Sequence, residues 1–319
     1  RYNVFRPYTF TTGNKIKILD KIFNFFLRKS LANIIKRINP NVIYGHFWQS
    51  AHNAYQIAKK CNIPIFVASG ESSIRIDCSD KKGIKEFADY VAGVICVSTK
   101  NKNESVALGL TIPEKCIVIP NAIDPSKFYK KDKIQVREHL GIAKDDFVIA
   151  FVGSFIERKG SNRVAAAIKQ LNNPAIKSIF IGKPMSNDNR FIPECDGILF
   201  RGTLEHNKIA DYLNAADVFV LPTLHEGCCN AIVEAMACGL PIISSDRDFN
   251  YDILNSNNSI LVDPNNIDCI CQAIEKLYND KKLRDKMSRI ALETAFNLNI
   301  GNRASLIIEF IQSKIANRL

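Results

Sequence analysis

Short apolar runs alternate with helical patterns along almost the whole chain, and this alternation constrains the fold most. The runs are rich in Val, Ile and Phe, as buried strands are, and helical segments such as 51–60 and 99–108 separate them. Strands that are joined through helices lie parallel, with right-handed crossovers. The sequence therefore predicts an α/β protein with parallel sheets. The predicted strands are 42–44, 64–67, 93–97, 116–119, 147–152, 178–181, 197–200, 217–221, 242–244 and 260–262.

The length and composition favour two domains. The chain has 319 residues, 46% hydrophobic and 24% charged, which is enough for two cores. A polar segment with Pro125 and several lysines follows residue 124 and separates two series of strands. We therefore expect an N-terminal domain at 1–124 and a C-terminal domain at 125–298, followed by a helix at 299–319.

One turn between a predicted strand and a helix carries two carboxylates. The run 217–221 leads into an irregular segment that ends at Asn230, a suitable N-cap for a helix that Gly239 stops. Such a helix directs unpaired backbone N–H groups out of the carboxyl edge of a parallel sheet, where anionic ligands bind. Glu226 would lie in that crevice, and Glu234 could reach a ribose diol. From spacing alone, a turn-stabilising Glu226 and a solvent-facing Glu234 remain an alternative.

A family resemblance bears on this alternative. The pattern Glu226-Gly227-x-x-Asn230-x-x-x-Glu234 resembles the E-x7-E signature of retaining glycosyltransferases of family 4, which use nucleotide sugars. Three further segments resemble motifs of the same family in the same order: 41–46, 118–124 and 150–160. The resemblance implies the GT-B fold, two Rossmann-like βα domains facing each other across a cleft. It also implies that the helix at 299–319 returns to complete the N-terminal, acceptor-side domain, while 125–298 binds the donor.

The resemblance also implies roles for individual residues. Glu226 would contact donor-sugar hydroxyls, Glu234 the nucleotide ribose, and His46 the transferred sugar or the reacting centre. Lys159, helped by Arg158, would hold the diphosphate. Two cations beside a helix N-terminus can neutralise a leaving nucleoside diphosphate, so neither a metal nor a cofactor is required. The other expected donor contacts are Gly153, Ser154, Arg201, Gly202, Gly227, Cys228, Cys229 and Asn230.

The sequence departs from the family pattern at two positions, and two of the proposed roles have simpler alternatives. Ser154 replaces the family's arginine, so either Arg158 takes over its phosphate contact or donor binding is weaker. Ala122 replaces a common glycine, which is harmless only if its φ is negative. Arg158 and Lys159 could instead form an ordinary solvated charge pair, and His46 could be a structural histidine.

Two routes could retain the configuration of the transferred sugar. Retention requires either a covalent glycosyl enzyme or a same-face route in which the leaving phosphate acts as the base. No residue is marked as a dedicated nucleophile, so we favour the same-face route by resemblance. The histidines other than His46 lack metal-ligand spacing, which argues against a zinc site.

Charge and cysteine content bear on location. The ten cysteines have no regular spacing, which indicates reduced thiols in a cytoplasmic protein. The net charge is +11, and no run of 18 apolar residues occurs. From Leu19 onward, residues such as Ile22, Phe26 and Ile35 recur at helical spacing among basic residues. This helix could lie on an anionic leaflet at the inner face of the cell membrane, or pack on the sheet with its lysines in water. Nucleic-acid binding is not expected, because the basic residues are dispersed.

The predicted function follows from these features. We expect transfer of a sugar from a nucleotide diphosphate donor, a UDP-sugar favoured, to a glycan or lipid-linked acceptor in bacterial cell-surface polysaccharide synthesis. The alternatives are a catalytically silent nucleotide-sugar binder, or another GT-B enzyme such as a sugar-nucleotide 2-epimerase or a phosphorylase. The chain starts at Arg1 without the family's opening strand and glycine-rich loop, so we interpret it as truncated by one βα unit.

Overall fold

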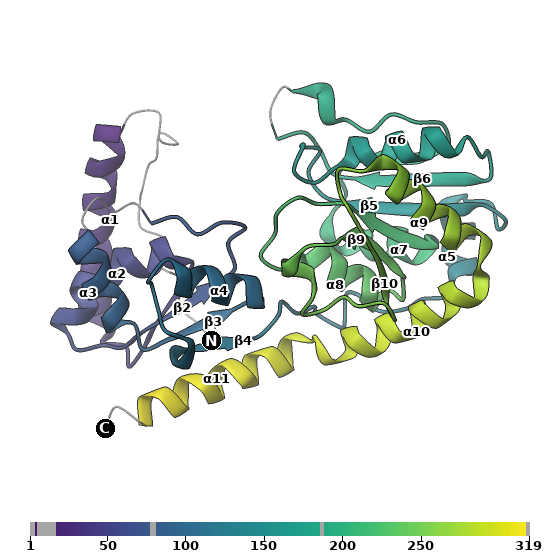
Figure 1. Ribbon diagram of the computed structural model, residues 1–319. Coiled ribbons are helices and arrows are strands. Elements are labelled where there is room, and N and C mark those ends of the chain that lie inside the picture. Colours follow the sequence, from purple (N-terminus) through teal and green to yellow (C-terminus); the bar gives the residue numbers. More distant parts are fainter. Residues whose placement is uncertain (1–3, 5–16, 77–80, 186–187, 317–319) are drawn as a thin grey trace. The chain divides into compact units, whose positions relative to one another are not determined.

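The computed structural model describes residue 4 and residues 17–76, 81–185 and 188–316. These residues form two compact α/β units, one within Arg1–Ile119 and Leu306–Leu319 and the other Pro120–Ser305 (Figure 1). All strand pairings among the described residues are parallel. The predicted α/β fold with two parallel-sheet units is confirmed. Arg1, at the position of the inferred truncation, lies outside the described residues.

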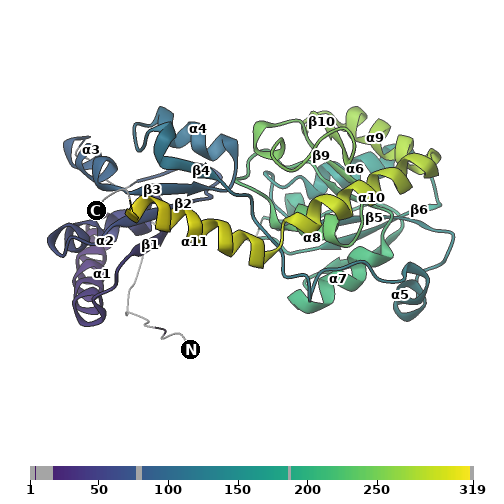
Figure 2. The same ribbon diagram turned by 90° about the horizontal axis from the view of Figure 1, so that it is seen from below.

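The first unit, called unit 1 below, is a four-stranded sheet between helices. The strand order is β1-β2-β3-β4. Helix α11 lies across these strands on one face, as Figure 2 shows, and Phe310 of this helix packs on Phe66 and Ile95. The opposite face packs on Trp48, Tyr55 and other residues of the helices between the strands. The elements are α1 (Lys17–Ile38), β1 (Ile43–His46), α2 (Trp48–Lys60), β2 (Ile65–Ser69), α3 (Lys81–Tyr90), β3 (Gly93–Cys96), α4 (Thr99–Ala107), η1 (Pro113–Lys115), β4 (Cys116–Val118) and α11 (Ile300–Ala316).

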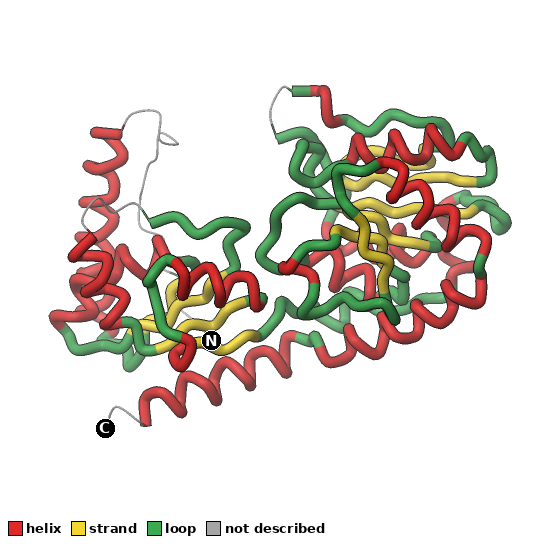
Figure 3. The backbone as a smooth tube through the Cα atoms, in the orientation of Figure 1, coloured by secondary structure: helices red, strands yellow, loops and turns green. Residues whose placement is uncertain are grey.

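The second unit, unit 2, is a doubly wound six-stranded sheet. Its order is β10-β9-β8-β5-β6-β7, and helices cover the strands on both faces (Figure 3). Helices α6 and α9 pack against each other, and α8 packs against α7 and α10. The elements are α5 (Lys133–Leu140), β5 (Phe147–Val152), α6 (Ser161–Leu171), β6 (Ile176–Ile181), η2 (Asn189–Phe191), β7 (Ile198–Gly202), α7 (His206–Ala215), β8 (Val218–Leu221), α8 (Asn230–Ala237), β9 (Ile242–Ser245), η3 (Asp248–Asn250), β10 (Ser259–Val262), α9 (Ile267–Asn279) and α10 (Lys281–Asn297).

The strand order of unit 2 identifies a candidate position for a ligand. The chain runs from β5 outward through β6 to β7, and then returns to the other side of β5 to form β8, β9 and β10. The direction of winding therefore reverses between β5 and β8. In open parallel sheets, ligands bind at the carboxyl edge at such a reversal.

Within the described residues, no helix is long and apolar enough to cross a membrane. The nine cysteines that the structure describes are free thiols.

Candidate active site

Two loops leave the carboxyl ends of the neighbouring strands β5 and β8 and touch each other. The N–H of Leu224 donates to the carbonyl of Arg158 at 2.8 Å. Gly160 has φ +77°, and a Cβ there would lie 2.9 Å from the carbonyl oxygen of Pro222. Arg163 Nη2 donates to the same carbonyl at 2.8 Å. The close approach therefore needs a glycine at 160 and fixes one loop against the other.

Glu226 is the centre of the charged cluster in these loops. Its Oε1 accepts from Lys159 Nζ at 2.6 Å and from Arg158 Nη1 at 2.7 Å. Thr223 Oγ1 donates to the same oxygen at 2.8 Å. The Glu226 side chain is 11% exposed and that of Lys159 14%. Lys159 is therefore not part of a solvated surface pair, and the structure brings three of the predicted site residues together.

Helix α8 begins beside this cluster. Its first residue is Asn230, and Cys229 is the N-cap, without a side-chain capping hydrogen bond. The predicted N-cap, Asn230, is thus one residue too late, because its Oδ1 instead accepts from Asn121 Nδ2 at 2.8 Å. Lys159 Nζ lies 3.9 Å from Cys229 Sγ. The Lys159 ammonium therefore lies beside the positive N-terminal end of α8, and both favour the binding of an anion.

The two adjacent cysteines at this point are uncharged. Burial raises the pKa of the Cys228 thiol to about 12 and also raises the pKa of Cys229. Both thiols are therefore neutral near pH 7 and add no negative charge. Gly227 is buried beside them, and the Cys228 carbonyl accepts from Asn121 Nδ2 at 2.9 Å.

Glu234 lies one turn into α8 and is buried. Its side chain is 11% exposed, and its Oε1 is 3.1 Å from Nε2 of His206 at the start of α7. The His206 ring in turn packs edge-on against Phe128, with ring centroids 5.1 Å apart. Burial raises the pKa of Glu234, an effect that the hydrogen bond from His206 opposes. A solvent-facing Glu234 is therefore ruled out.

Gly153, which follows β5, packs closely on the end of the neighbouring strand β6. Gly153 donates its N–H to the carbonyl of Ile181 at 2.9 Å, and a Cβ on Gly182 would lie 1.9 Å from the Gly153 oxygen. Ser154 follows, with its carbonyl accepting from Ile156 at 3.0 Å. Ala122 is not among the described residues with positive φ, so the missing glycine there causes no strain.

Arg201 and Gly202 end β7, two strands away from β5. Arg201 Nη1 donates to the carbonyl of Pro193 at 2.8 Å, and the carbonyl of Gly202 accepts from Gly182 at 2.8 Å. Their contact with a nucleotide stays a prediction.

His46 lies in unit 1. It is the last residue of β1, it is exposed, and its ring packs edge-on against Tyr44 with centroids 5.3 Å apart. The carboxyl end of the strand is where the sequence predicts it. Its role toward the reacting centre stays a prediction.

Four residues that fix the positions of the site residues were not predicted from the sequence. Thr223 bonds Glu226, Asn121 bonds the start of α8, Arg163 joins the two loops, and His206 holds Glu234. Asn121 lies inside the motif-like segment 118–124 and could have been found there. Thr223 lies only three residues before its partner Glu226 and could also have been found. Arg163 and His206 carry no local signal, because their partners are set by the tertiary fold. Within the described part of the chain, no group of three or more His, Cys, Asp or Glu residues could hold a metal.

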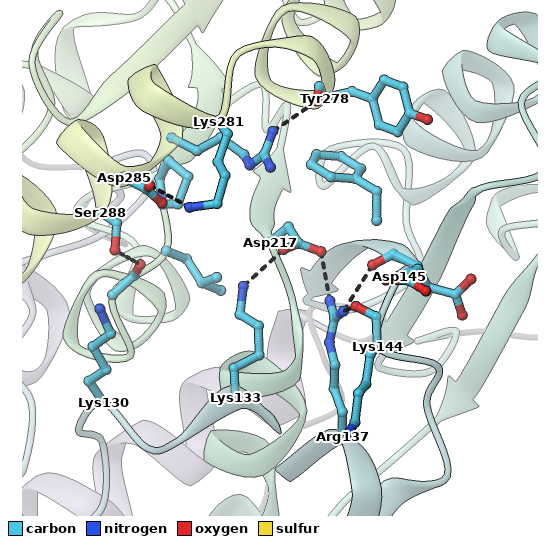
Figure 4. A pocket seen from close by; sticks show the side chains of 16 residues that line it. Lys130, Lys133, Arg137, Lys144, Asp145, Asp217, Tyr278, Lys281, Asp285 and Ser288 are labelled. Carbon is cyan, nitrogen blue, oxygen red and sulfur yellow. Dashed lines mark hydrogen bonds and ion pairs between the residues drawn. The ribbon is translucent and has the colours of Figure 1, made fainter. Parts of the chain in front are cut away.

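A cavity of about 490 Å³ lies at the opposite, amino edge of the same sheet (Figure 4). Asp217, just before β8, accepts there from Arg137 at 2.7 Å and from Lys133 at 2.9 Å. Arg137 also donates to the carbonyls of Lys144 and Asp146. These contacts join α5 to the sheet, so the cavity is lined by structural ion pairs and is separate from the carboxyl-edge site.

Two parallel-sheet units, with a charged cluster at the reversal point of the second, are the architecture of the GT-B glycosyltransferases. The chain belongs to the family described as "Glycosyl transferases group 1", whose model matches residues 132–294, just over half of the chain. The model of "Glycosyltransferase Family 4" matches residues 6–127.

Relatives of known name agree with this assignment. The chain is 26% identical over 308 residues to the UDP-Gal:α-D-GlcNAc-diphosphoundecaprenol α-1,3-galactosyltransferase of Escherichia coli, covering 91% of this chain and 79% of that protein. It is 25% identical over 262 residues to TuaC of Bacillus subtilis, a glycosyltransferase named for teichuronic acid biosynthesis. That match covers 80% of this chain but 66% of TuaC, slightly under two thirds of its length.

Solved structures show the same fold. Anabaena HepE in complex with UDP has a TM-score of 0.80 and 17% identity, covering 93% of this chain and 84% of that one. Sucrose-phosphate synthase from Thermosynechococcus elongatus has a TM-score of 0.79 and 19% identity, covering 93% of this chain and 79% of that one.

Proposed function

We propose that this protein transfers a sugar from a nucleoside diphosphate donor to a glycan or lipid-linked acceptor, and that unit 2 binds the donor. One observation carries the proposal: Glu226 is bonded to both Lys159 and Arg158 beside the start of α8. Two cations and a helix N-terminus at the reversal point of a parallel sheet form a site for a diphosphate. A UDP-sugar is favoured, and the solved HepE complex with UDP supports this choice.

The bound diphosphate competes with Glu226 for the two cations. Lys159 and Arg158 then turn toward the phosphate oxygens, and the Glu226 carboxylate is released to accept hydroxyls of the donor sugar. Arg158 takes the phosphate contact that Ser154 cannot make, since its guanidinium already reaches Glu226 beside Lys159. Gly153 lets the backbone approach the diphosphate, and Glu234 accepts from the ribose hydroxyls.

The proposed reaction proceeds on one face of the sugar, with retention. The bond between the anomeric carbon and the diphosphate oxygen breaks, and its electron pair stays on the diphosphate. The acceptor oxygen bonds to the anomeric carbon from the same side, and its proton passes to the departing phosphate oxygen. Lys159, Arg158 and the α8 N–H groups stabilise the developing charge, so no metal is needed. A trapped glycosyl adduct on Glu226 or another side chain would contradict this route.

The remaining predicted contacts complete the proposal. Arg201 and Gly202 contribute main-chain contacts to the base, and the loop of Gly227, Cys228, Cys229 and Asn230 surrounds the sugar. His46 contacts the transferred sugar. The name of TuaC supports a part in bacterial cell-surface polysaccharide synthesis, and that of the E. coli galactosyltransferase supports a lipid-linked acceptor. The proposed reaction takes place at the cytoplasmic face of the membrane.

Replacement of Glu226 by alanine tests the enzyme against a silent nucleotide-sugar binder. We expect donor turnover to fall by about 100-fold or more, because a group that acts on the reacting sugar is lost. Binding of the nucleoside diphosphate persists, since Lys159 and Arg158 remain. Wild-type protein that binds nucleotide but neither transfers nor hydrolyses any of a panel of UDP-, GDP- and ADP-sugars would be the silent binder. A product with an inverted 2-position, or dependence on inorganic phosphate, would identify an epimerase or a phosphorylase.

We also propose that helix α1 of unit 1 contacts an anionic membrane surface. Its large apolar side chains do not all pack inward: Ile35 is buried on α2, but Phe25 is 63% and Phe26 56% exposed. Further along the helix, Lys29, Lys36 and Arg37 are exposed. An exposed apolar patch followed by cations suits a helix that lies in an anionic interface. The exposed residues of this face are Leu19, Ile22, Phe25, Phe26, Lys29, Lys36 and Arg37.

Vesicle sedimentation tests the membrane contact. Wild-type protein should bind phosphatidylglycerol vesicles and bind phosphatidylcholine vesicles at least about tenfold more weakly, since each basic residue near an anionic surface contributes on the order of 1 kcal/mol. The double variant Phe25→Ser/Phe26→Ser should lose most of this binding. Phe296→Ser is the matched control, because Phe296 is 78% exposed on α10 of unit 2. Equal loss in the control, or binding that ignores lipid charge, would contradict the proposal.

A further inference from the structure

The turn between β1 and α2 holds an aromatic residue in an unusual backbone conformation. Phe47 has φ +70° and ψ 152°. The other non-glycine residues with positive φ in the described chain are Asn39, Asn62 and Asn172. Asparagine tolerates the left-handed region, whereas positive φ with extended ψ is almost confined to glycine. Phe47 is therefore strained where glycine would not be.

The surrounding contacts force this conformation. The N–H of Phe47 donates to the carbonyl of Ala68 at 2.9 Å, which keeps it in register with β2. Before it, a Cβ on Gly45 would lie 2.7 Å from the Cβ of Ala51, so β1 and α2 approach closely. After it, Trp48 is fully buried, and its Nε1 donates to Ser105 Oγ at 3.3 Å. Phe47 has no freedom to relax between these fixed neighbours.

Glu71, in the loop after β2, also holds the start of α2. Phe47 occupies the N-cap position of α2 and has no side-chain capping bond. Glu71 Oε1 accepts instead from the N–H of Trp48 at 2.8 Å, and its Oε2 accepts from the N–H of Gly70 at 2.9 Å. Glu71 thus acts as the N-cap of a helix that starts 23 residues earlier.

Phe47 is only partly buried. It is 48% exposed, at the carboxyl edge of the unit 1 sheet and directly after the exposed His46. A strained backbone that holds an apolar ring in water has no advantage for stability, and such strain is typical of ligand sites. An exposed aromatic ring at this edge matches the apolar C–H face of a sugar.

We propose that Phe47 binds the acceptor, with its ring against the C–H face of a pyranose, and that Glu71 is the positioning residue that fixes it. This inference rests on the proposed function, because it assumes a carbohydrate acceptor.

Saturation-transfer NMR on the full chain tests this. The probe is a mixture of methyl glycosides of glucose, galactose and N-acetylglucosamine, recorded without nucleotide. At least one glycoside should receive saturation on its ring C–H protons from wild-type protein. The Phe47→Gly variant should bind it about fivefold more weakly, the loss expected for one aromatic contact, and Phe47→Trp should restore binding. Glu71→Gln, which loses one acceptor oxygen, should weaken binding without changing UDP affinity.

The melting temperature of Phe47→Gly and a control variant distinguish a binding role of Phe47 from a structural one. Phe47→Gly relieves the strain, so its melting temperature should not fall, whereas a purely structural Phe47 would lower it on replacement. Leu108→Ala is the matched control, because Leu108 is 53% exposed at the end of α4 and should leave glycoside binding unchanged. Equal binding by wild type and Phe47→Gly, binding of simple alcohols in place of glycosides, or no glycoside binding at all would overturn the inference. Failure to bind UDP would instead refute the proposed function.

Discussion

At the scale of residues, Glu226 and Glu234 illustrate what spacing can and cannot predict. The sequence placed both carboxylates around one turn and one helix, and the structure buries both. The distant residues that bond these two carboxylates could not be predicted from the local sequence. Lys159 precedes Glu226 by 67 positions and His206 precedes Glu234 by 28, and only the sheet order brings them together.

Glu234 should make stability depend on pH. Burial raises its pKa in the folded protein above the usual 4.5. The folded state therefore binds the proton more tightly than the unfolded state, and the free energy of unfolding falls as pH rises from about 4.5 through the folded pKa. Glu234→Gln has no carboxylate to desolvate. We expect this variant to be more stable than wild type at pH 7, by on the order of 1 kcal/mol.

Thermal unfolding across pH measures this difference. The variant's advantage should shrink toward zero as pH falls below about 4.5, where both states of wild-type Glu234 are protonated. An advantage that is independent of pH would show that the gain does not come from the charge of Glu234. A variant less stable than wild type at pH 7 would show that His206 compensates the buried charge fully. Phe47 is the residue-scale feature that no pattern predicts, because its backbone conformation is imposed by Ala68, Trp48 and Glu71.

At the scale of elements, the agreement between sequence and structure is close. All ten predicted strands are present, and none has an end that differs by more than two residues. Buried parallel strands give continuous apolar runs, which are the clearest local signal. The start of α8 was predicted one residue late, since Asn230 bonds Asn121 instead of capping its own helix. In α1, helical spacing predicted the helix but could not show that Phe25 and Phe26 face solvent.

The contact between the β5 and β8 loops can be tested with a pair of glycines. Gly160 and Gly141 both have positive φ, +77° and +69°, but only Gly160 would place a Cβ against another segment. Gly141→Ala should therefore cost about 1 kcal/mol from backbone strain alone. Gly160→Ala adds the clash with the Pro222 carbonyl and should lower stability by about 2–3 kcal/mol.

Chemical denaturation of the two variants gives the comparison, and nucleotide binding provides the second readout. Gly160→Ala should also weaken UDP binding, because it displaces the loop that carries Lys159, whereas Gly141→Ala should leave it intact. Equal stability losses and equal UDP affinities would mean that the close approach of the loops has no role in the site.

At the scale of the whole molecule, two units with separate cores follow from length and alternation. The strand order within each unit does not, because it depends on which strands the crossovers bring together, and a local pattern carries no information on that. The order β10-β9-β8-β5-β6-β7 is nevertheless what gives the molecule a site, because it sets the loops after β5 and β8 side by side.

Calorimetric titration of UDP and of uridine into wild-type protein and Lys159→Met tests the central claim most directly, that Lys159 and the start of α8 hold a diphosphate. We predict that the variant binds UDP about 10- to 100-fold more weakly, the loss expected for one charge-assisted contact, while uridine affinity changes less than about twofold. Equal loss for UDP and uridine, or UDP binding that does not depend on Lys159, would contradict the account.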